Sequence, residues 1–119
     1  MIRNPNNVAT FKRGSSFALT FNLPEPAHGR FTGWTLRAQM RTDAHNRNGG
    51  LIADIPAEWT DETCTAIKVL YHATDDWALG PAAFDVLMTD PDTGTKVHSA
   101  TMYFNIERSI TTPEVTPNE

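Results

Sequence analysis

Residues Trp34 to Arg41 read Trp-Thr-Leu-Arg-Ala-Gln-Met-Arg, and this stretch decides the fold. Apolar and polar side chains alternate at every second position, which is the period of a strand with one buried face and one exposed face. The polar face carries Arg37, Gln39 and Arg41, which we expect to lie in solvent. The stretch therefore predicts a half-buried β-strand.

The same period of two residues recurs along the chain. Further strands are expected at residues 8–12, 16–23, 51–55, 63–71, 84–89 and 99–106. Between residues 63 and 71 two registers are open. We favour the one that turns Ile67 and Val69 inward, because it leaves Lys68 in solvent and burial of Lys68 would be costly.

Turn signals separate these strands. Gly and Asn in 43–50 and Asp, Pro and Gly in 90–94 are typical of loops and tight turns. Residues 73–81 predict a short helical turn that crosses between sheets, with Trp77 plugging the corner. Because no segment has a sustained helical period, the sequence predicts one all-β domain, an antiparallel β-sandwich of about seven strands. It would span residues 1–108, and residues 109–119 would form an extended or disordered tail.

Composition limits the functional classes. A chain of 119 residues is the size of one domain, and the single cysteine, Cys64, cannot form an internal disulfide, so we expect folding in a reducing compartment. The N-terminus lacks the apolar core of a signal peptide, and no apolar run is long enough to span a membrane. A net charge of −4 argues against nucleic acid as the main partner.

Charge is unevenly spread along the chain. Residues 1–50 hold seven Lys and Arg against two acids, and residues 51–119 hold three against twelve. If this asymmetry survives folding, a basic face and an acidic face would suit head-to-tail stacking of copies. The alternative is an ordinary solvated surface.

No residue pattern predicts an active site. The four histidines, at 28, 45, 72 and 98, show no metal-ligand spacing, and Cys64 has no predicted base beside it. We therefore expect no catalytic residues, no metal, no cofactor and no enzymatic activity.

Protein contact is the function that the surface residues favour. Trp59 is expected to be exposed in the loop 57–61, beside Glu58, and Trp is enriched at interface hot spots. Arg37 and Arg41 on the strand face and Arg47 in the loop 43–50 complete the candidate contact residues. The alternative is a carbohydrate or host-surface binding module in which Trp59 and the loop 43–50 make the contact.

Several segments, taken in order, resemble a known family. They are Phe11–Phe17, Gly33–Arg41, Trp77–Val86, the turn Asp90–Gly94, Thr101–Ile106 and Ile110–Pro113. Their order is similar to that of small immunoglobulin-like β-sandwich proteins of tailed bacteriophages and prophages, of the type found as N-terminal domains of baseplate and tail-fibre attachment proteins. The resemblance covers residues 8 to 113 or so.

The resemblance implies a structural or adaptor protein of the virion, in the tail, baseplate or head-to-tail region. Such a protein would be made in the cytoplasm of the bacterial host and would contact other virion proteins and further copies of itself. A capsid decoration protein is the alternative within the same class. The resemblance assigns no individual functional residue.

Overall fold

The computed structural model describes residues 8–43 and 50–111 of the chain. The described part holds nine strands and one three-residue 3-10 turn. They are β1 (Val8–Lys12), β2 (Phe17–Asn22), η2 (Glu25–Ala27), β3 (Thr35–Thr42), β4 (Leu51–Ile55), β5 (Ala57–Trp59), β6 (Ala66–Tyr71), β7 (Gly80–Thr89), β8 (Lys96–His98) and β9 (Met102–Glu107). Since η2 is the one helical element there, no described helix could cross a bilayer.

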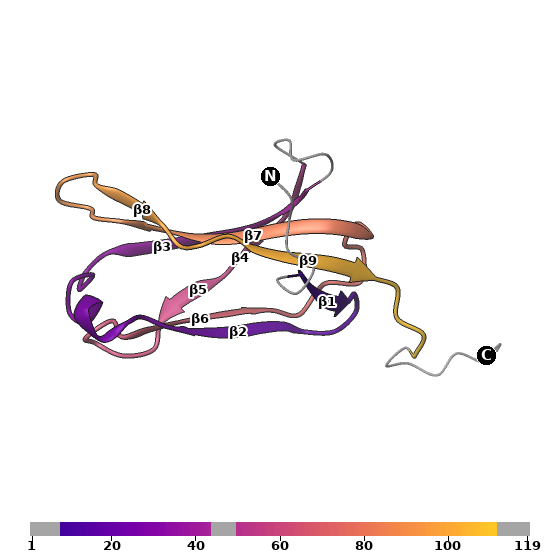
Figure 1. Cartoon of the computed structure of the whole chain (residues 1–119), viewed down its shortest axis with the longest axis horizontal. Helices are drawn as coiled ribbons and strands as arrows, with labels where there is room; N and C mark the ends of the chain where they lie inside the picture. Colours follow the sequence, from indigo (N-terminus) through magenta and orange to yellow (C-terminus); the bar gives the residue numbers. More distant parts are fainter. Residues whose placement is uncertain (1–7, 44–49, 112–119) are drawn as a thin grey trace.

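The strands form two stacked sheets (Figure 1). The large sheet has the order β1-β9-β7-β3-β4, with β8 also paired to β7, and the small sheet has the order β2-β6-β5. The strands are divided between the sheets as in immunoglobulin domains. The small sheet holds β2, β5 and β6 in the places of strands B, D and E, and the large sheet holds β3, β4 and β7 in the places of C, C′ and F, with β8 and β9 in the place of G. The prediction of an all-β, immunoglobulin-like sandwich is confirmed.

Alternation of side chains explains why these segments form strands. In β7 every second residue from Ala82 to Met88 is buried, and in β3 Ala38 and Met40 are buried between exposed arginines. In β6 Ile67 and Val69 are buried and Lys68 is exposed, so the favoured register is confirmed.

An aromatic cluster joins the two sheets. Phe17 of β2 is 1% exposed, and its ring lies 5.3 to 5.6 Å from the rings of Phe11, Trp77, Phe84 and Phe104. Three of these partners belong to the large sheet, so Phe17 ties one sheet to the other. Each such ring pair adds about 0.5–1.5 kcal/mol to the free energy gained by burying the rings.

The structure corrects three details of the predicted fold. Nine strands replace about seven, because the short strands β5 and β8 are also present. The pairing of β1 with β9 is parallel, whereas every other pairing among the described strands is antiparallel. The helical turn lies at Glu25–Ala27, and residues 73–79 form a non-helical turn.

Hydrogen bonds explain where the helical turn forms. Two successive bonds, from Ala27 N to Pro24 O and from His28 N to Glu25 O, close a 3-10 turn. The corner before β7 has a single bond of this kind, from Trp77 N to Thr74 O. Trp77 is nevertheless buried, with only 2% of its surface exposed, so the prediction that its side chain fills this corner is confirmed.

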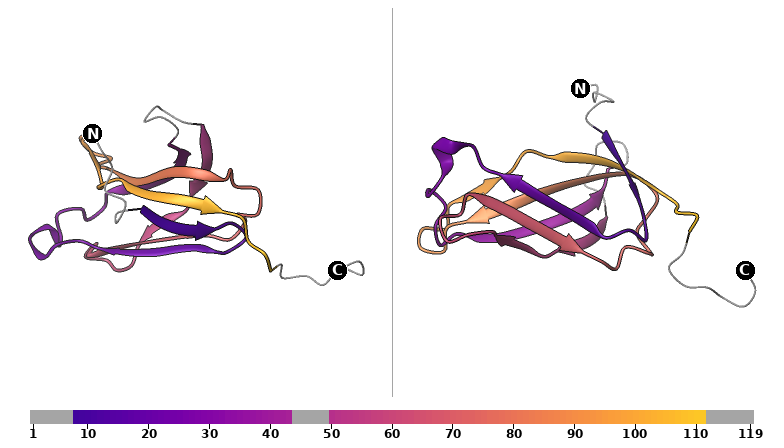
Figure 2. Two further views of the ribbon diagram at one scale, coloured as in Figure 1. Left: turned by 45° about the vertical axis from the view of Figure 1, so that its right-hand side comes forward. Right: turned by 90° about the horizontal axis from the view of Figure 1, so that it is seen from below.

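Connections gather at the two ends of the sandwich. The segments 23–34, 60–65 and 90–95 follow β2, β5 and β7 at one end, on the left of Figure 1. The turns 13–16 and 72–79 and the chain after Glu107 lie at the other end, as Figure 2 also shows. Of the predicted tail, Ser109 to Thr111 are described and form no strand, and residues 112–119 lie outside the described residues.

Candidate protein-contact face

The outer face of the large sheet carries two of the predicted contact residues. Arg37 and Arg41 alternate along β3 with the buried Ala38 and Met40, so both arginines point away from the core. Gln39 lies between them on the same face and is half-buried. The prediction that this strand face meets solvent is therefore confirmed for both arginines.

An aspartate from the next strand organises these side chains. Asp54 of β4 lies opposite Gln39 in the register, and its Oδ1 accepts a hydrogen bond from Gln39 Nε2 at 2.9 Å. Arg37 Nε lies 3.5 Å from the same oxygen. Arg41 Nη2 donates to Gln39 Oε1 at 3.1 Å. We call Arg37, Gln39, Arg41 and Asp54 the polar row.

The electrostatics of the polar row favour the ionised aspartate. The hydrogen bond from Gln39 is the main cause that lowers the pKa of Asp54, and the charges of Arg37 and Arg41 lower it further against a partial loss of hydration. The Arg37 and Asp54 side chains are 67% and 55% exposed, so their ion pair contributes little to stability. The pair brings the guanidinium group of Arg37 beside the carboxylate of Asp54.

A shallow hollow adjoins the polar row. It measures about 120 Å³ and is lined by Arg37, Gln39, Asp85, Leu87 and His98, which come from β3, β7 and β8. The sheet register explains the grouping, because Gln39 lies opposite Asp85, and Leu87 lies opposite both Arg37 and His98. The hollow and the polar row together make up what we call the contact face.

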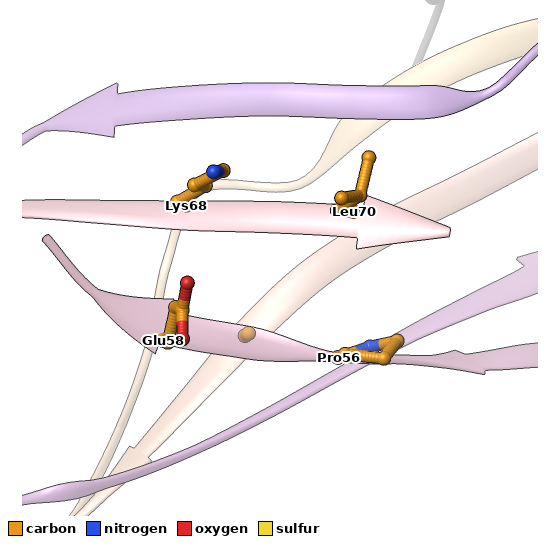
Figure 3. A pocket seen from close by; sticks show the side chains of 5 residues that line it. Pro56, Glu58, Lys68 and Leu70 are labelled. Carbon is orange, nitrogen blue, oxygen red and sulfur yellow. The ribbon is translucent and has the colours of Figure 1, made fainter. Parts of the chain in front are cut away.

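The structure separates Glu58 from the arginines. Glu58 of β5 is exposed on the outer face of the small sheet, where it lies opposite Lys68 of β6. The two side chains border a hollow of about 220 Å³ with Pro56, Ala57 and Leu70 (Figure 3). Glu58 and the arginines therefore lie on opposite outer faces of the sandwich.

Trp59 differs from its predicted place. It lies in β5, not in a loop, and it is half-buried, because Ala57 and Trp59 face inward when Glu58 faces outward. Its Nε1 donates to Trp34 O at 2.9 Å, and its ring stacks on Phe31 with a centroid distance of 6.3 Å. The polar edge of the indole is thus used inside the protein. This geometry gives no support to a carbohydrate platform built on Trp59.

The remaining predicted contact residue, Arg47, lies outside the described residues. Within residues 8–43 and 50–111, no three His, Cys, Asp or Glu side chains come together to hold a metal ion. Cys64 is buried and carries a free thiol.

One polar pair was not foreseen. Ser16 Oγ lies 2.7 Å from Nδ1 of His72, at the exposed end of the small sheet. In the described part of the chain no acidic group is hydrogen-bonded to His72, so the pair lacks the third member that orients a catalytic histidine.

Sequence reasoning also missed Asp54, Asp85 and His98 as members of the contact face. Their neighbours are set by the register between strands that are distant in the sequence, and no local signal reports it. The alternation within each strand did place two of them on an exposed face, because Asp54 lies between the buried Ala53 and Ile55, and Asp85 lies between the buried Phe84 and Val86.

Comparison with protein-family models and with curated proteins finds no match to this chain.

Proposed function

We propose that this protein is a non-enzymatic structural or adaptor component of a bacteriophage particle, in the tail, baseplate or head-to-tail region, and that it acts through protein contacts. Two lines support the proposal. One is the order of sequence segments that resembles small immunoglobulin-like phage proteins. The other is the contact face, which presents ordered charged side chains on an open sheet.

The polar row carries the proposal on the structural side. Arginine is enriched at interface hot spots because its planar group binds carboxylates through two hydrogen bonds. Arg37 and Arg41 are both exposed, and each donates to a neighbour on the same face, Arg37 to Asp54 and Arg41 to Gln39. A partner that offers carboxylates to this face would therefore meet two exposed guanidinium groups.

The contact face also indicates the chemistry of its partner. Its positive groups, Arg37 and Arg41, lie on either side of Gln39 along β3, and the negative Asp54 and Asp85 lie beside Gln39 on the two neighbouring strands. A surface with the opposite order of charges would match it, and a contact of this kind weakens as salt rises. Leu87 and the hollow beside it offer an apolar position within the same patch.

Mass spectrometry of purified particles from the phage or induced prophage that encodes the chain tests the proposal. We expect the chain in the particles at a fixed ratio to known tail proteins. Its absence from intact particles, with the free protein present in the lysate, would contradict the proposal. Density for the chain on the capsid surface would instead support the decoration-protein alternative.

A further inference from the structure

Strand β2 has one edge that no strand among the described residues covers. It pairs with β6 on one side, and among the described strands none pairs with its other side. The bond from Leu23 N to Thr65 O, at 2.9 Å, shows which residues in this pair of strands are hydrogen-bonded to each other. Because bonded residues alternate in antiparallel pairs, Phe17, Leu19 and Phe21 bond to β6. The backbone N–H and C=O groups of Ala18, Thr20 and Asn22 therefore point to the open edge.

The position of β1 explains why no described strand lies beside this edge. In immunoglobulin domains the first strand lies beside strand B, which is β2 here. In this chain β1 pairs instead with β9 of the large sheet. No hydrogen bond within the described residues uses the outward backbone groups of Ala18, Thr20 or Asn22.

The other edge strands among the described residues, β1, β4, β5 and β8, carry features that discourage pairing. Strand β8 has three residues and begins with Lys96. Strand β5 has three residues, with Glu58 at its centre. Strand β4 contains Asp54, has an irregular register with β3 and runs into Pro56. Strand β1 ends in Lys12. Strand β2 has six residues with no charge, no proline and a regular register, so it is the edge best suited to accept a strand.

We propose that β2 pairs antiparallel with β2 of a second copy across a twofold axis, so that the two small sheets join into one. The outward backbone groups fix the register. Thr20 lies opposite Thr20 of the second copy, and Ala18 lies opposite Asn22 on either side. Each of these pairs exchanges two backbone hydrogen bonds, which gives about six in total. The inference depends on this edge alone and stands apart from the proposed phage function.

Side chains are compatible with this register. Ala18, Thr20 and Asn22 are small or uncharged, so no like charges meet. On the inner face, Leu19 comes opposite Phe21 of the second copy in a close pair that does not share hydrogen bonds. Both residues are half-buried in the single chain, and pairing would cover them further.

Lys68 does not oppose the pairing. It lies opposite Thr20 in the register of β2 and β6. In the joined sheet, three strand spacings would therefore separate the two copies of Lys68, which is about 14 Å. That distance exceeds the screening length of about 8 Å at physiological salt, so their repulsion is small.

The register provides a charge-swap experiment. Thr20→Glu places a carboxylate next to Lys68 within one chain, which the monomer tolerates, and directly opposite its own copy in the dimer, which repels. Thr20→Lys repels itself in the same way. A mixture of the two variants places opposite charges together and should pair. Thr10→Glu is the matched control, because Thr10 is exposed in β1, whose outer edge no described strand covers.

Sedimentation of the purified full chain over a concentration series measures pairing, and circular dichroism checks that each variant is folded. We expect the native chain and Thr10→Glu to dimerise with the same affinity. Each Thr20 variant alone should dimerise at least about tenfold more weakly. The mixture of Thr20→Glu and Thr20→Lys should dimerise more strongly than either variant alone. Hydrogen exchange should show protection of the Thr20 amide only in the dimer. A native chain that stays monomeric at about 1 mM, Thr20 variants that dimerise like the native chain, or a dimer with an unprotected Thr20 amide would each overturn the proposal.

Discussion

At the scale of single residues, Thr74 links the two turns at one end of the sandwich. Its side chain is fully buried, accepts a hydrogen bond from Gly14 N at 2.7 Å and donates one to Ser15 O at 2.6 Å. Gly14 has a φ of +90°, a backbone conformation that residues other than glycine rarely adopt. The hydroxyl of Thr74 therefore bonds to both sides of this glycine turn from the neighbouring turn 72–79.

Replacement of Thr74 by valine tests this role. Thr74→Val keeps the shape of the side chain but removes both hydrogen bonds, and each bond contributes about 0.5–1.5 kcal/mol, so we expect a loss of about 1–3 kcal/mol in the free energy of unfolding. Urea denaturation measures it. The same change at the exposed Thr101 should cost within about 0.5 kcal/mol. Equal losses in the two variants would show that the bonds of Thr74 contribute little.

Asp61 stabilises the loop before β6 through its charge. Its carboxylate accepts hydrogen bonds from Thr65 Oγ1, Thr65 N and Thr63 Oγ1, and the bond from the Thr65 hydroxyl is the main cause that lowers the pKa of Asp61. These bonds hold a segment in which Cys64 has a φ of 56°.

This lowered pKa predicts a pH dependence. The folded state prefers the ionised carboxylate, so its stabilisation is complete above the ordinary aspartate pKa of about 3.9 and is lost as pH falls through the lower folded value. Thermal unfolding measures the effect between about pH 6 and about pH 2, a range that extends about two pH units to either side of that pKa. The melting temperature of Asp61→Asn should fall less steeply than that of the native chain below about pH 4. Parallel curves would contradict the assignment.

At the scale of elements, the alternation of side chains predicted most of the strands and their inward faces. It succeeded for β3 and β7 because each buries one face along its length. It failed for β5 and β8, which have three residues each and show no period of their own. The burial of Trp77 was foreseen, but a single bonded turn suffices to bury it, and no helix is needed.

Phe84 tests the packing between the sheets. Its ring lies 5.3 Å from that of Phe17 and 6.1 Å from that of Phe21, both on the opposite sheet. Phe84→Ala should lower the free energy of unfolding by about 3–5 kcal/mol, since the cavity opens between layers that cannot collapse fully. The same change at the half-buried Phe31 should cost less, and urea denaturation of both variants measures the difference. An equal or smaller cost at Phe84 would place the core elsewhere.

At the scale of the whole molecule, folding mixes the charges that the sequence separates. Arg37 and Arg41 come from the basic first half of the chain, and Asp54 and Asp85 come from the acidic second half. Since β4 and β7 flank β3, these four residues share one face. The basis for head-to-tail stacking of a basic face on an acidic face is therefore absent from the large sheet.

The candidate site was predictable only in part, because it joins residues from strands that are distant in the sequence. The sequence placed Arg37 and Arg41 on one exposed strand face, because parity within a strand is local. It grouped Glu58 and Trp59 with them, although adjacent residues of one strand point to opposite sides. Which residues meet across strands depends on register, and that is a property of the folded sheet.

Incorporation of surface variants into phage particles tests the central claim, that the protein acts through the contact face. Arg37→Gln and Lys68→Gln each remove one positive charge from an exposed strand position, on opposite outer faces. Mass spectrometry of purified particles assembled with either variant gives its copy number relative to tail proteins. We predict that Arg37→Gln is depleted from the particles and that Lys68→Gln is incorporated as the native chain is. Equal incorporation of both folded variants would contradict the account.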